Sequence, residues 1–92
     1  MDRTQAEAAV RGGEALEGAD LAGVDLASAD LGGALFDRVS LRGAKLAGAR
    51  LRESIFTACD FTGADLSGAD VEHAIFDRCE LSGARLAGAR LG

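Results

Sequence analysis

The chain has 92 residues, which suits one small domain, and a net charge of −5, which weighs against direct binding to nucleic acid. It has 13 glycines and no proline, tryptophan or tyrosine, an unusual mixture for a compact globule. No apolar run approaches the roughly 20 residues that a membrane helix requires, and no basic and apolar leader opens the sequence. We therefore expect a cytoplasmic protein with no membrane partner.

Residues 1–13 are predicted to form a capping segment ahead of a repeat that occupies residues 14–92. Thr4, with Glu7 three residues later, matches a helix capping box. Gly12 and Gly13 would end such a helix. Because the open end of a repeat structure exposes its core and unpaired backbone groups, we expect a short helix over residues 4–11 to cover that end.

Residues 14–92 repeat with a period of five. The residue two before each block centre is small, except for Glu14, and glycine dominates two residues after it. Helices repeat their apolar positions every 3.6 residues and exposed strands every two, so this period predicts a chain that turns a corner in every block. The centres are all large and apolar: Leu16, Leu21, Leu26, Leu31, Phe36, Leu41, Leu46, Leu51, Phe56, Phe61, Leu66, Val71, Phe76, Leu81, Leu86 and Leu91.

The pattern, as in Ala64-Asp65-Leu66, resembles that of the pentapeptide-repeat family. The resemblance covers residues 14–92 and implies an all-β solenoid, a right-handed, four-sided parallel β-helix. Four sides require coils of 20 residues, and residues 34–53, 54–73 and 74–92 align at that spacing. Residues 14–33 form a less similar first coil. We expect about four coils, stacked at the strand spacing of about 4.8 Å.

The interior is predicted to hold stacked ladders of side chains. One core ladder comprises Leu16, Phe36, Phe56 and Phe76. Cys59 and Cys79 take a small inward position one coil apart, and we expect them to act as small buried residues, because further metal ligands are lacking. Two corners of the solenoid carry glycine. The other two carry residues such as Arg38, Glu53 and His73, where we expect a different turn type.

The residue before each centre is predicted to point outward. Two outward ladders alternate in charge, namely Asp25, Lys45, Asp65 and Arg85, and Asp30, Arg50, Asp70 and Arg90. We expect neighbours in these ladders to form ion pairs and fix the register of the coils. Another set of residues forms an acidic corner: Glu17, Asp20, Asp37, Asp60, Asp77 and Glu80. Arg38 and Arg78 interrupt it.

Leu35, Ile55 and Ile75 form an outward apolar strip on the first side. The strip either docks a partner or second copy, is covered by the N-terminal helix, or reflects the preference of strands for β-branched residues. The last coil has no predicted cap. A C-terminal end-to-end homodimer is expected to bury it, in part because some members of the family pair that way.

No catalytic, cofactor or metal site is predicted. A filled four-sided rod offers flat sides rather than a cleft, and His73, the only histidine, is expected to be a solvated turn residue beside Glu72. The glycines recur as turn residues, not as a phosphate-binding loop. We therefore expect a non-catalytic protein-interaction or assembly scaffold with an unidentified protein partner.

Two alternatives to this scaffold stay open. One is a DNA mimic that acts through the acidic corner, because some members of the family resemble DNA in shape and charge, bind bacterial type II topoisomerases, and inhibit or protect gyrase. A rigid spacer, natural or engineered, is the other alternative.

Overall fold

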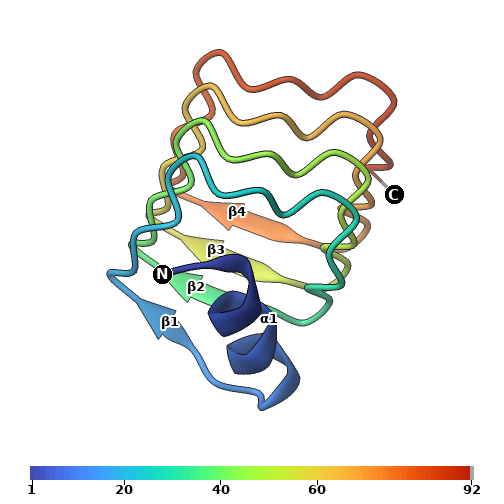
Figure 1. The fold of residues 1–92 in the computed structure, drawn as a ribbon. Coiled ribbons are helices and arrows are strands. Elements are labelled where there is room, and N and C mark those ends of the chain that lie inside the picture. The colour runs from blue at the N-terminus through green and yellow to red at the C-terminus, as the bar shows by residue number, and fades with distance from the viewer. Residues whose placement is uncertain (92) are drawn as a thin grey trace.

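One helix and one parallel sheet make up the regular structure of the computed structural model, which describes residues 1–91. Gly92, the last residue of the predicted repeat, lies outside the described residues. The elements are α1 (Arg3–Arg11), β1 (Leu16–Glu17), β2 (Leu35–Asp37), β3 (Ile55–Thr57) and β4 (Ile75–Asp77). The strands pair in the order β1-β2-β3-β4 (Figure 1). Within residues 1–91, no helix has the length and apolar character to cross a membrane.

The chain winds around a central axis, and each strand pairs with the strand of the next coil. Phe36 lies in register with Phe56, and Phe56 with Phe76. On the other three sides the coils meet through single parallel bridges, such as Asp25 with Lys45. Figure 1 shows these successive turns of chain stacked above one another. The predicted four-sided parallel β-helix is confirmed.

Large side chains fill the inside of the β-helix. In the core ladder, Leu16, Phe36 and Phe56 are buried, whereas Phe76 is half-buried near the C-terminal end. The ring centroid of Phe56 lies 5.5 Å from that of Phe36, 5.1 Å from that of Phe61 and 5.0 Å from that of Phe76. Phe56 is thus surrounded by aromatic rings from its own coil and from both neighbours.

The corner that carries Glu53 and His73 has the same turn as the glycine corners. Both residues have φ 60°, close to the 64° of Gly43. The Ser54 N–H closes the turn on the Leu51 carbonyl at 3.2 Å, as in the glycine corners. The predicted difference in turn type is therefore wrong here. Hydrogen bonds between coils hold this backbone, so residues other than glycine adopt a conformation that is usually strained for them.

The corner that carries Arg38, Ala58 and Arg78 differs, as predicted. These residues also have positive φ, between 53° and 56°. Across residues 1–91, however, no turn hydrogen bond from the residue that follows them to the preceding block centre is found. The bond to the next coil is kept, as at the other corners, from the Arg38 N–H to the Thr57 carbonyl at 2.8 Å.

Helix α1 begins one residue earlier than predicted. Its N-cap is Asp2, whose carboxylate accepts from the Gln5 N–H at 2.9 Å, while the Gln5 side chain accepts from the Asp2 N–H at 3.0 Å. The prediction of Thr4 and Glu7 as the capping box is therefore wrong. The two pairs have the same spacing, and aspartate is at least as good an N-cap as threonine.

Helix α1 covers the N-terminal end of the β-helix (Figure 1). Ala6 is fully buried in the core cluster, and Ala9 and Val10 pack against that cluster. The helix ends at Gly12, its C-cap, as the sequence predicts. Helix α1 therefore caps the core at this end.

Candidate functional site

The apolar strip lies on the side of the β-helix formed by β1–β4. Leu35, Ile55 and Ile75 stack in register on neighbouring strands and are 42%, 39% and 53% exposed. A shallow depression of about 180 Å³ lies beside them, lined in part by Ala15 and Asp37. Because α1 packs into the end of the core, the alternative that it covers the strip is wrong. Three aliphatic side chains thus lie side by side at the surface.

The acidic corner borders the strip and is only partly neutralised. Arg38 lies 3.7 Å from Asp37, and Arg78 lies 3.7 Å from Asp77, with both arginine side chains more than 70% exposed. Ion pairs as exposed as these contribute little to the stability of the fold. Among residues 1–91, Glu17, Asp20 and Glu80 have no ion pair. The corner keeps an excess of negative charge, but basic side chains interrupt it.

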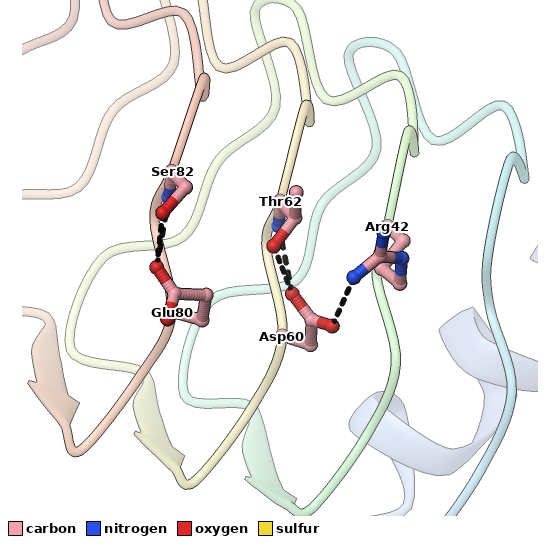
Figure 2. Close-up of polar contacts among 5 residues, drawn as sticks. All are labelled: Arg42, Asp60, Thr62, Glu80 and Ser82. Atoms are coloured by element: carbon pink, nitrogen blue, oxygen red, sulfur yellow. Dashed lines mark hydrogen bonds and ion pairs between the residues drawn. The ribbon is translucent and has the colours of Figure 1, made fainter.

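Asp60 is the most strongly held carboxylate of the acidic corner (Figure 2). One of its oxygens accepts from the Thr62 hydroxyl at 2.5 Å and from the Thr62 N–H at 2.9 Å, and the other accepts from Arg42 at 3.0 Å. These hydrogen bonds, with those from Thr62 the largest cause, lower the pKa of Asp60 from 3.8 to about 2. In the next coil, the Ser82 hydroxyl donates to Glu80 in the same way.

We expect Thr62→Val to raise the pKa of Asp60, because it removes the hydroxyl donor and keeps the shape of the side chain. The lowered pKa means that this carboxylate stabilises the fold above about pH 3.8 and loses that effect as the pH falls toward 2. Titration of the Asp60 carboxyl carbon by NMR measures the change. Asp65, which bonds the Ser67 N–H in the same way, is the internal control and should not move. If the pKa of Asp60 is the same in the Thr62→Val variant, Thr62 is not the main cause of its low value.

The two alternating ladders have the predicted register but not the predicted ion pairs. Lys45 bridges to Asp25 and Asp65 through the backbone, yet no ion pair joins two ladder members within residues 1–91. The carboxylates bond their own turns instead, as Asp25 does with the Ala27 N–H at 3.0 Å. The prediction is wrong because aspartate is short and finds a donor two residues ahead. The preference of aspartate for such turns is the signal that could have predicted it.

Glu72 and His73 do not form an acid–base pair with a site around them. Glu72 is hydrogen-bonded to Arg52, which also lies 3.4 Å from Asp70. His73 is an exposed corner residue with positive φ. No group of three or more metal-ligating side chains occurs in residues 1–91.

The two cysteines are free and point into the β-helix. Cys59 is buried and its Sγ lies 3.4 Å from the Phe36 carbonyl, whereas Cys79 is half-buried and its Sγ lies 3.2 Å from the Phe56 carbonyl. Burial raises the pKa of both thiols above the usual 9.0. Protonated, they act as small weakly polar residues of the core.

We expect the free energy of unfolding to fall above about pH 9. A raised thiol pKa favours the folded state below the unfolded value of 9.0, and this advantage is lost as the pH rises through the folded pKa. Urea unfolding at a series of pH values measures it. The chain has no tyrosine and only one lysine, Lys45, so few other groups titrate there. A double variant, Cys59→Ala with Cys79→Ala, should lose most of this decline; an unchanged decline would contradict the assignment.

The C-terminal end of the described β-helix exposes its inward ladder. Leu81, Leu86 and Leu91 are 37%, 43% and 72% exposed, whereas Phe61 and Leu66, one coil earlier on the first two of these sides, are fully buried. The backbone of the last coil faces this end as well. A second apolar surface therefore lies across the axis, opposite to the end that α1 covers.

The structure is a β-solenoid with a filled interior, turn-bonded aspartates, and apolar surfaces on one side and at one end. The family model described as a pentapeptide repeat region matches residues 15–86, and the chain belongs to this family. A comparison with curated protein sequences gave no match.

Solved structures of other pentapeptide repeat proteins share this fold. One from the Arabidopsis thaliana thylakoid lumen is 33% identical, with a TM-score of 0.84 over 94% of this chain and 59% of the other. HetL of the cyanobacterium Nostoc sp. strain PCC 7120, involved in the regulation of heterocyst differentiation, is 37% identical, with a TM-score of 0.80 over 85% of this chain and 36% of HetL. The chain thus spans 59% and 36% of these two relatives.

The fluoroquinolone resistance protein QnrB1 is a more distant structural neighbour. It is 19% identical, with a TM-score of 0.58 over 84% of this chain and 60% of that one. At this identity the likeness shows the fold alone.

Proposed function

We propose that the chain is a non-catalytic protein-interaction scaffold that binds a partner through its apolar strip. Pentapeptide repeat proteins are generally structural or interaction scaffolds rather than enzymes. The observation that carries the proposal is the strip itself, where Leu35, Ile55 and Ile75 lie in register and 39–53% exposed on a flat side of a filled rod. Exposed aliphatic rows of this kind mark interaction surfaces.

The charge distribution favours this scaffold over a DNA mimic. A mimic of DNA needs sustained negative charge along its length. Here Arg38, Arg42 and Arg78 lie against carboxylates of the acidic corner. We also infer that the scaffold acts in a reducing compartment such as the cytoplasm, because both cysteines are free.

The test is a selection of binders from a random peptide library displayed on phage. Selected peptides should bind the intact chain and lose binding to a variant with Ile55→Ser and Ile75→Ser. A variant with Asp25→Asn and Asp65→Asn, on another side of the rod, is the control and should bind as the intact chain does. Circular dichroism checks that each variant keeps the fold. If no selected peptide depends on the strip, the proposal fails and a rigid spacer becomes the better description.

We further propose that two copies associate end to end through the last coil. The support is the exposure of Leu81, Leu86 and Leu91 at that end, because a second copy would bury these side chains and pair the backbone of the last coil. Light scattering should give twice the mass of one chain, and Leu86→Arg should reduce it to one. The strip variant should keep the doubled mass. A single-chain mass for the intact protein would rule out the dimer.

A further inference from the structure

We infer that the partner segment is a cationic amphipathic α-helix that lies along the axis of the β-helix, with its apolar side chains on Leu35, Ile55 and Ile75. This inference rests on the proposed function and names the class of partner for the same surface. It follows from the spacing of the strip and from the charges on its two edges.

The spacing of the strip matches one face of a helix. Its three side chains stand on consecutive paired strands, and such strands lie about 4.8 Å apart. Residues one turn apart on a helix are separated by about 5.4 Å along its axis, so side chains at i, i+4 and i+7 meet the three rows with a mismatch of about 1 Å. An extended segment places side chains of one face about 6.7 Å apart, and falls out of step by the third row.

Carboxylates border the strip, as a ladder on one edge and as a single residue on the other. On one edge, Glu17, Asp37 and Asp77 follow Ala15, Leu35 and Ile75 by two residues, and Thr57 takes the remaining place in this ladder. Arg38 and Arg78 lie 3.7 Å from Asp37 and Asp77, but both arginines are largely exposed, and pairs of this kind neutralise a carboxylate only in part. On the other edge, Glu53 is exposed two residues before Ile55 and has no ion pair among residues 1–91. Lysines or arginines that flank the apolar row of a helix would therefore face the carboxylate ladder on one side and Glu53 on the other.

The depression beside the strip adds a recess at the N-terminal end of this contact. It is lined by Ala15, Leu35, Phe36, Asp37, Ile55 and Thr57, so an apolar side chain can enter beside Leu35 and Ile55 with the Asp37 carboxylate at its rim. The strip is shorter than a stable protein interface, so the complex is a weak, salt-sensitive one.

The test uses a fluorescein-labelled helical peptide of about 18 residues, with leucines in one i, i+4, i+7 row and lysines on both flanks. A second peptide keeps the leucine row and carries glutamates in place of the lysines. Fluorescence anisotropy with the full chain measures the binding of each. We expect the lysine peptide to bind at least tenfold more tightly than the glutamate peptide at low salt, and the difference to shrink as salt is added.

Variants separate the apolar and charged contributions. Ile55→Ser with Ile75→Ser should weaken binding of the lysine peptide about tenfold. Asp37→Asn with Asp77→Asn should weaken it about threefold at low salt, whereas the control pair Asp25→Asn with Asp65→Asn removes the same charge elsewhere and should have no effect. Equal binding of both peptides, or equal effects of the two Asp→Asn pairs, would overturn the cationic partner while leaving strip docking intact. Failure of both peptides to bind would overturn the helical partner. The phage-display selection described above would then show whether the strip binds any peptide at all.

Discussion

Phe56→Ala is expected to lower the free energy of unfolding by about 3–5 kcal/mol. The Phe56 side chain is 1% exposed, and three other phenylalanine rings lie within 5.5 Å of it between centroids. Removing it opens a cavity in the middle of the stack, where neighbouring coils cannot close in without breaking their backbone hydrogen bonds. Loss of the edge contacts with Phe36 and Phe61 adds to the effect.

Phe76→Ala is the matched control for this prediction. Phe76 stacks on Phe56 at an interplanar angle of 27°, but it is only half-buried, in the last coil that the structure describes. Urea unfolding should therefore show a smaller loss for Phe76→Ala than for Phe56→Ala. Equal losses would indicate that coil position does not control stability, and a loss below about 1.5 kcal/mol for Phe56→Ala would contradict the cavity argument.

The sequence predicts the fold because each block has only one way to bury its centre. A centre such as Phe56 has to point inward, and the small residue two before it, Ser54, shares that face because side chains alternate along extended chain. Ser54 fits inside because its hydroxyl donates to the Leu31 carbonyl at 2.9 Å. Periodicity thus determines which residues are inside, and with them the backbone register.

The repeat spacing does not predict what the outward side chains bond. Asp25 and Lys45 are neighbours in register, yet Asp25 bonds its own turn, because a donor two residues away is always within reach whereas a lysine ammonium across the coils is held only weakly. The N-cap is a similar case, because Asp2 and Thr4 both suit this position and the helix uses Asp2. Spacing alone cannot rank such options.

Ala6→Asp is expected to lower the free energy of unfolding by about 2–4 kcal/mol. Ala6 is the one fully buried residue of α1, and it closes the N-terminal end of the core. An aspartate at this position would bury a charge among apolar side chains, and the chain avoids this by detaching α1. Detachment exposes the first coil, so the variant should also show a tendency to self-associate through the uncovered end.

Ala8→Asp is the control, because Ala8 is exposed on the same helix. It introduces the same charge and the same change in helix propensity, so it should cost no more than about 0.5–1 kcal/mol. Urea unfolding and light scattering on the two variants separate burial from helix propensity. A large, similar loss in both would mean that the helix itself, rather than its packing, carries the stability. Near-normal stability in both would mean that the β-helix does not need its cap, and that the first coil is stable with its end open.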